Sequence, residues 1–205
     1  MPQKNKIFLI IFIIVILIFI SFFSYFISQL VKKTEADHGV TLKEIYTRIH
    51  LNLENQANSW KNNSYLSWIS GGPISRDGKS SANWRFDYNA RNHTFVPTYD
   101  MIGFDVNNAG EIIHKEFIYN STLFHLPIVN WTLDSDEIIN LVYNDPILSD
   151  FLKSKNAGNK ASLQLENLKG NPGIPVCTLT FSYYHDDYWS PIYIKVNAHT
   201  GEIIR

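Results

Sequence analysis

The chain has 205 residues, and 18 Lys and Arg stand against 19 Asp and Glu, a net charge of −1 at pH 7. Four of the basic residues precede Thr34, which leaves 14 basic and 19 acidic residues in the rest of the chain, a net charge of −5. This balance argues against nucleic acid as a partner, because phosphate binding relies on a basic surface. Cys177 is the single cysteine, so no internal disulfide can form.

Residues 7–31 contain no charged side chain and consist mostly of Ile, Leu, Val and Phe. About 20 apolar residues in a helix span a bilayer core, so this run predicts a single transmembrane helix that contacts lipid, between a tail (residues 1–6) and a linker (residues 32–40). A cleaved signal peptide is the alternative, but it has a shorter apolar core and a small-residue cleavage site. Lysines flank both ends, so the orientation rests on the short tail, which favours a cytoplasmic N-terminus and an extracytoplasmic C-terminal domain.

The rest of the chain contains an internal repeat. Residues 102–113 (IGFDVNNAGEII) resemble residues 192–204 (IYIKVNAHTGEII), with one extra residue in the second turn. Upstream, residues 84–88 and 179–183 both alternate between apolar and polar positions, which predicts half-buried strands.

Each copy of the repeat begins with a helical pattern. The apolar positions of the first are Leu42, Ile45, Ile49 and Leu53, and those of the second are Ile138, Leu141 and Val142. Thr41 is the expected N-cap of the first helix, with Glu44 placed for a capping box, and Asp134 or Ser135 is the expected N-cap of the second.

The expected fold class is therefore α+β: an N-terminal transmembrane helix followed by two tandem units, each a helix plus an antiparallel sheet of three or four strands. The units cover residues 41–120 and 132–205. About 75 residues is small for an independent core, so we expect the two copies to pack on each other or to share a sheet edge.

A helix, then strands, then a closing hydrophobic-x-Val-Asn-x-x-Thr-Gly-Glu-Ile-Ile hairpin resembles the PepSY domain, and residues 194–204 carry most of the similarity. The first copy departs from the pattern at Ala109, where the second has Thr200, but its Gly72, Ile74, residues 77–80 and Trp84 are similar to PepSY-like units of cell-surface proteins. The resemblance implies a cystatin-like fold, an extracytoplasmic location and a non-catalytic role, such as restraining a protease. It offers no catalytic residue to carry over.

The turns that contain the Gly-Glu-Ile-Ile sequences allow two further predictions, one about their glycines and one about calcium binding. Gly110 and Gly201 are predicted to be structural, supplying a positive φ in a hairpin turn. The stretch from Asp105 to Glu116 has the spacing of an EF-hand loop, but position 5 is Ala109 and strands replace the flanking helices, so a β-turn is favoured over a calcium site.

Other chemical signals are weaker than their structural interpretations. Residues 71–80 lack the first Gly of a phosphate loop, because that position is Pro73. His185 and the two Asp residues that follow it could hold a metal together with His199, but residues 185–187 are better explained as a solvated loop. Cys177 lies in a predicted strand, where no helix N-terminus lowers its pKa. No enzyme activity, metal or cofactor is expected.

One aromatic run stands out as a candidate contact surface. Residues 183–189 (YYHDDYW) cannot all face one side of a strand, so some of these rings are expected to be exposed. Exposed aromatic rings favour partner binding. The candidate binding residues are Tyr184, His185, Tyr188 and Trp189.

The sequence thus leaves two hypotheses. The first is a membrane-anchored, extracytoplasmic PepSY-like binding module that restrains a protease or another envelope protein. The second is a structural or assembly component of a membrane complex. An inhibitor should show a rigid exposed loop, whereas an assembly component should show a flat apolar patch.

Overall fold

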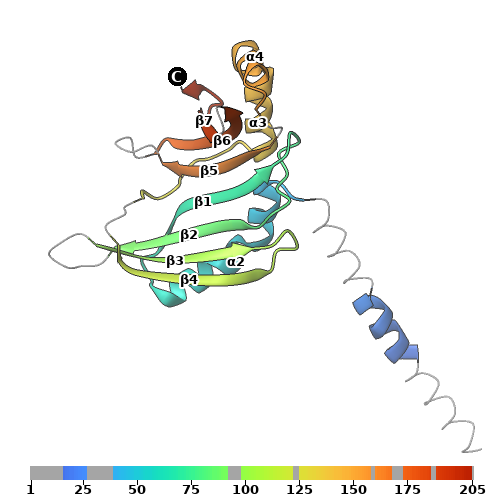
Figure 1. Ribbon diagram of the computed structural model, residues 1–205. Coiled ribbons are helices and arrows are strands. Elements are labelled where there is room, and N and C mark those ends of the chain that lie inside the picture. Colours follow the sequence, from blue (N-terminus) through green and yellow to red (C-terminus); the bar gives the residue numbers. More distant parts are fainter. Residues whose placement is uncertain are drawn as a thin grey trace, which may run out of the picture.

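The computed structural model describes residues 16–26, 39–91, 98–121, 125–157, 160–167, 173–185 and 188–204, without the side chains of residues 184, 185, 188 and 189. Within these ranges the strands form one eight-stranded sheet in the order β4-β3-β2-β1-β5-β6-β7-β8 (Figure 1). The strands are β1 (Tyr65–Ile74), β2 (Trp84–Arg91), β3 (Tyr99–Val106), β4 (Ile112–Ser121), β5 (Ala161–Asn167), β6 (Pro175–His185), β7 (Tyr188–Asn197) and β8 (Ile203–Ile204). Every neighbouring pair is antiparallel.

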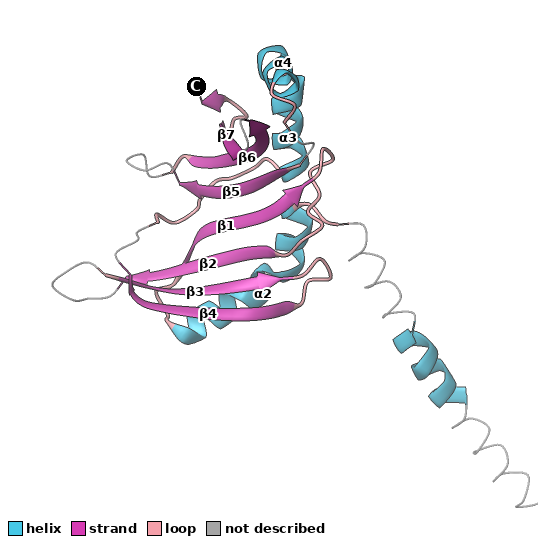
Figure 2. Cartoon of the chain, viewed as in Figure 1, coloured by secondary structure: helices cyan, strands magenta, loops and turns pink. Residues whose placement is uncertain are grey.

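Three helices pack with this sheet: α2 (Leu42–Trp60), α3 (Ser135–Asn144) and α4 (Pro146–Ser154). α2 lies across strands β1 to β4, and α3 lies beside the second half of the sheet (Figure 2). The Tyr46 ring of α2 lies 5.9 Å from Phe86, and the Tyr143 ring of α3 lies 6.0 Å from Phe181.

Both helices cover the same face of the sheet. Phe86 of β2 pairs with Ile69, Ile69 with Leu165 and Leu165 with Cys177, so these buried residues form one apolar row on that face. Phe181 follows Cys177 at an even spacing and therefore points the same way. The fold thus has two layers, and we call the opposite side of the sheet its open face.

The N-termini of α2 and α3 meet and share hydrogen-bonding groups. Thr41 and Glu44 form the expected capping box, and Asp134 is the N-cap of α3. The Asp134 carboxylate also accepts hydrogen bonds from the Thr41 hydroxyl (2.6 Å) and from the backbone N–H of Lys43 (2.9 Å). The Ser135 hydroxyl accepts from the backbone N–H of Leu42 and donates to the carbonyl of Gly78. One carboxylate therefore stabilises the positive ends of two helices at once.

The expected fold class is wrong in its division into two tandem units. β1 and β5 pair through Ile69–Leu165, Ser70–Gln164 and Gly71–Leu163, so the two halves contribute to one continuous sheet. The buried residues of both halves also form a single hydrophobic cluster. The physical reason is the small size of each half, since a sheet of four strands with one helix leaves an edge and part of a core uncovered.

The transmembrane helix expected at residues 7–31 is not shown either. The described part of that run is a helix over residues 16–26. No helix within the described ranges is long and apolar enough to cross a membrane. Residues 7–15 and 27–31 lie outside the described residues.

Candidate functional site

The open face carries a row of polar side chains that crosses the sheet. Strand alternation turns Trp84, Phe86 and Tyr88 of β2 toward the helices, so Arg85 and Asp87 point to the open face. Arg85 pairs with Asp105 of β3 on one side and with Ser70 of β1 on the other, and Ser70 pairs with Gln164 of β5. Ordinary strand alternation therefore brings both halves of the chain to this face.

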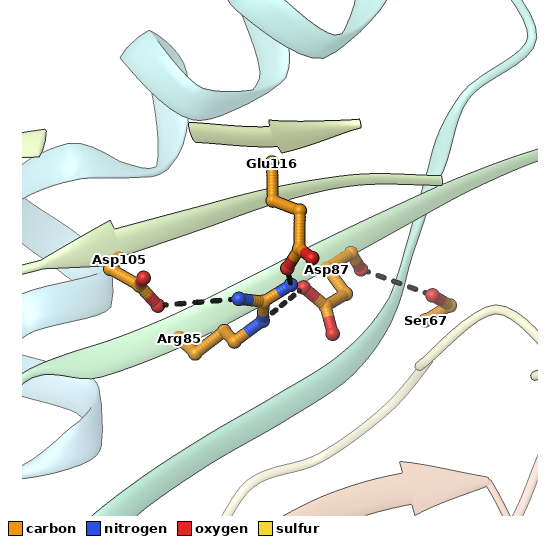
Figure 3. A network of polar contacts seen from close by, with 5 residues as sticks. All are labelled: Ser67, Arg85, Asp87, Asp105 and Glu116. Atoms are coloured by element: carbon orange, nitrogen blue, oxygen red, sulfur yellow. Dashed lines mark hydrogen bonds and ion pairs between the residues drawn. The ribbon is translucent and has the colours of Figure 1, made fainter. Parts of the chain in front are cut away.

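Arg85 is surrounded by three carboxylates (Figure 3). Its Nε donates to Asp87 Oδ1 at 2.9 Å, and its Nη2 donates to Glu116 Oε2 at 2.5 Å. Its Nη1 lies 3.7 Å from Asp105 Oδ1. This acidic cluster, Arg85 with Asp87, Asp105 and Glu116, joins β2, β3 and β4 and carries a net charge of −2 when all four groups are ionised.

Asp87 is the least exposed member of the acidic cluster, at 6% of its surface. Burial raises the pKa of its carboxyl from 3.8 to about 6 against the opposing effect of Arg85, and the charges of Asp105 and Glu116 raise it further. Burial lowers the pKa of Arg85, but the neighbouring carboxylates outweigh that effect and leave it raised. Arg85 therefore stays charged while Asp87 titrates near pH 6.

Gly103 leaves the space in which this ion pair sits. A Cβ atom at Gly103 would lie 2.4 Å from Arg85 Nη2 and 2.5 Å from Asp87 Oδ1. In the repeat, the equivalent position of β7 is Tyr193, which is 65% exposed. The acidic cluster is therefore specific to the first half of the sheet.

The geometry of the acidic cluster fits a structural role better than a chemical one. All the guanidinium nitrogens of Arg85 face carboxylates, so the fork has no free side for an anionic ligand. No group of three or more His, Cys, Asp and Glu side chains among the described residues could hold a metal ion. Cys177 is completely buried, and burial raises the pKa of its thiol.

The predicted aromatic contact surface lies at the closed end of the β6–β7 hairpin. Tyr184 pairs with Trp189 and His185 pairs with Tyr188 along the backbone. The side chains of these four residues lie outside the described part of the structure, as do the intervening residues 186–187. This candidate site stays a prediction.

The two repeat turns have the same local construction. Gly110 has a φ of +83° and Gly201 a φ of +79°, and each backbone N–H donates to the carbonyl of the Asn that begins its turn, Asn107 or Asn197. Asp105 and Glu116, the ends of the calcium-like stretch, lie on two paired strands, and Arg85 forms an ion pair with each of them.

The turn between β1 and β2, which resembled a phosphate loop, packs against the start of α3. Gly78 has a φ of +76°, and a Cβ atom there would lie 2.1 Å from the Cα of Asp136. This turn has no room for a phosphate on that side, because α3 occupies it.

Sequence analysis missed a second surface, the outer edge of β4. β4, a strand of ten residues, is the terminal strand of the sheet, and among the described strands it pairs with β3 only. Its large apolar side chains are exposed: Ile113 at 52%, Phe117 at 47%, Ile118 at 36% and Tyr119 at 60%. The signal in the sequence was the two apolar groups 112–113 and 117–119, because adjacent apolar residues depart from the strict alternation of a half-buried strand.

No family model matches this chain, and neither a curated protein nor a solved structure is significantly similar to it. The PepSY resemblance therefore stays a prediction from the repeated hairpin motif.

Proposed function

We propose that this protein is a non-catalytic binding module that adds an extended segment of a partner protein to the free edge of β4. The observation that carries the proposal is the set of four exposed apolar side chains on a ten-residue edge strand. Edge strands are usually short, charged or covered, because a free edge is a template for another strand. Strand addition uses this template, with backbone hydrogen bonds for affinity and side-chain contacts for specificity.

The chemistry of the partner follows from the two sides of β4. Phe117 pairs with Ile102 and faces the helix side, where its ring lies 6.2 Å from Trp60 of α2. Glu116 faces the open side and belongs to the acidic cluster, which has an excess of negative charge. A matching strand therefore places apolar residues on the helix side and a Lys or Arg opposite Glu116.

Selection from a library of random 12-residue peptides tests this proposal. We expect the selected peptides to alternate apolar residues with a basic position. They should bind the double variant Ile113→Lys, Tyr119→Lys at least tenfold more weakly than the unmodified protein. The matched control is the double variant Ile147→Lys, Phe151→Lys, which introduces the same charge at two exposed residues of α4.

The result against the proposal would be selected peptides that bind the β4 double variant as well as the unmodified protein. Amide exchange gives an independent readout, because an added strand must protect backbone N–H groups of residues 112–121 and leave those of β8 unchanged.

An assembly role is the second candidate, favoured by the helix of residues 16–26, in which every residue is exposed and most are apolar. A photo-crosslinking residue placed in cells at His114 of β4 or at Phe22 of this helix separates the two. Adducts from His114 alone support a binding module, whereas adducts from both positions to the same complex support an assembly component.

The partner class and the location rest on the PepSY resemblance, which suggests a protease or another envelope protein outside the cytoplasm. The location is tested with Ser154→Cys, an exposed position of α4, in a Cys177→Ala background. Labelling by a membrane-impermeant reagent in intact cells supports an extracytoplasmic domain, and labelling only after lysis contradicts it.

A further inference from the structure

A shallow hollow of about 260 Å³ opens on the open face at the junction of β1 and β5, where the two halves of the chain meet. It is lined by Ser70, Gly72, Asn83, Arg85, Ser162 and Gln164. These side chains come from β1, β2, β5 and the loop before β2, so the hollow exists only because the two halves form one sheet.

The backbone of β1 keeps the hollow open. The pairing of β1 with β5 shifts register between Gly71 and Ile74. Gly72, at the centre of this shift, has a φ of +151°, and a Cβ atom there would lie 2.9 Å from the Cα of Ser162. A side chain at this position would be strained and would crowd the hollow.

The polar side chains around the hollow are available to a ligand. Within the described ranges, Ser70, Asn83, Ser162 and Gln164 make no side-chain hydrogen bond. Hydroxyl and amide groups can each donate and accept. Four such groups line one shallow hollow, and polar groups placed together in this way can fix the orientation of a small polar ligand.

Charge restricts the class of ligand further. Arg85 borders the hollow, but its guanidinium nitrogens face Asp87, Asp105 and Glu116 on the far side. The excess of carboxylates in the acidic cluster repels an anion, and the remaining lining groups are neutral. A neutral ligand rich in hydroxyl groups satisfies the lining without adding charge.

An aromatic side chain lies on the same face of β1, next to the residues that line the hollow. Trp68 precedes Ser70 by two residues on the same face, a spacing of about 7 Å along a strand. Its half-buried ring packs edge-on against His125 at 4.9 Å between centroids. An aromatic surface beside hydroxyl and amide groups offers one apolar and one polar contact to the same ligand.

We propose that this hollow binds a neutral saccharide. The hydroxyl groups of the saccharide form hydrogen bonds with the side chains of Ser70, Asn83, Ser162 and Gln164, and the apolar face of a sugar ring lies toward Trp68. This site lies on the open face and not on the outer edge of β4, so it does not depend on the proposed strand addition.

Saccharide binding is tested with four neutral trisaccharides, cellotriose, chitotriose, maltotriose and mannotriose, titrated up to 20 mM against the full chain and followed by saturation-transfer NMR. We expect at least one to bind, and Asn83→Ala and Gln164→Ala each to weaken that binding roughly tenfold, the loss expected for one hydrogen bond of about 1.4 kcal/mol. Gln56→Ala, a half-buried amide on α2 away from the hollow, is the matched control and should bind as the unmodified protein does.

Three results would overturn the proposal. One is the absence of binding by all four trisaccharides, and another is binding that Asn83→Ala and Gln164→Ala leave unchanged. The third is tighter binding of trigalacturonate than of any neutral trisaccharide, because that would contradict the charge argument. Thermal melting of each variant checks that the fold is retained, which is expected because both substituted side chains lie at the surface.

Discussion

The two halves of the sheet share a hairpin motif but treat the open face differently. In the first half, Arg85 and Asp87 belong to the acidic cluster and Gly103 leaves space for them, whereas the equivalent positions of the second half are Thr180, Ser182 and Tyr193. The first hairpin also continues into the ten residues of β4, while β8 has two. The two halves thus share a hairpin motif, but only the first half carries the acidic cluster and a long edge strand. We therefore expect binding surfaces first in that half.

The largest expected effect comes from the hydrogen bonds that join the N-terminus of α2, in the first half, to the N-terminus of α3, in the second half. Asp134→Ala removes acceptors from the Thr41 hydroxyl, the Lys43 N–H and the Ser135 N–H. Because these groups would lose a charged partner at two helix N-termini, we expect a loss of about 4 kcal/mol in the free energy of unfolding, measured by urea denaturation. Asp150→Ala, on a side chain 80% exposed, is the control and should change this free energy by less than about 0.5 kcal/mol.

If Asp134→Ala instead lost little stability, the halves would be held by the β1–β5 pairing and the shared hydrophobic cluster, without a large contribution from the helix caps. A biphasic unfolding curve would give the same information, because it would show that the halves unfold separately.

The second prediction tests the difference between the two halves of the open face, by disturbing the acidic cluster of the first half. Gly103→Ala places a Cβ atom within 2.5 Å of Arg85 and Asp87, so the ion pair must separate or the strand must move. We expect a loss of about 2–3 kcal/mol in the free energy of unfolding, as for other overpacked sites. Tyr193→Ala, at the equivalent exposed position, should cost less than about 1 kcal/mol. Equal costs would mean that the acidic cluster adapts to the extra atom.

Particular residues show how far sequence reasoning reaches here. Thr41 with Glu44, and Asp134, were recognisable as caps because capping is a local interaction between residues three apart. The pairing of β1 with β5 was left open, because it joins Ile69 to Leu165 across 96 positions and no local pattern encodes that register. The acidic cluster was missed for the same reason. Arg85 and Asp87 are sequence neighbours, but Glu116 reaches them only through the register of three strands.

The third prediction uses pH to test the burial of Asp87. Its pKa is raised to about 6 in the folded protein, so between pH 4 and pH 6 the folded state binds more protons than the unfolded state. Stability from this group is therefore present at low pH and is lost as the pH rises. We expect the unfolding free energy of the unmodified protein, relative to Asp87→Asn, to fall by about 2 kcal/mol from pH 4 to pH 7. A difference that is constant with pH would show that Asp87 is solvated.

The smallest expected effect concerns the feature that the two halves share. Asn107 Oδ1 accepts from the backbone N–H groups of Ala109 and Glu111, and Asn197 Oδ1 accepts from those of His199 and Thr200. Each side chain therefore serves two N–H groups of its turn, so Asn107→Ala and Asn197→Ala should each cost about 1 kcal/mol in the free energy of unfolding. The two sites lie in different hairpins, so the costs should add in the double variant.

Equal and additive costs would mean that the turns are interchangeable and that the halves differ only in what their strands carry beyond them. A much larger cost for Asn107→Ala would mean that the first turn also sets the register of β4 against β3. That register places Glu116 opposite Gly103, where it reaches Arg85. The long free edge and the acidic cluster would then depend on one turn, and the same variant should weaken peptide binding at β4 along with stability.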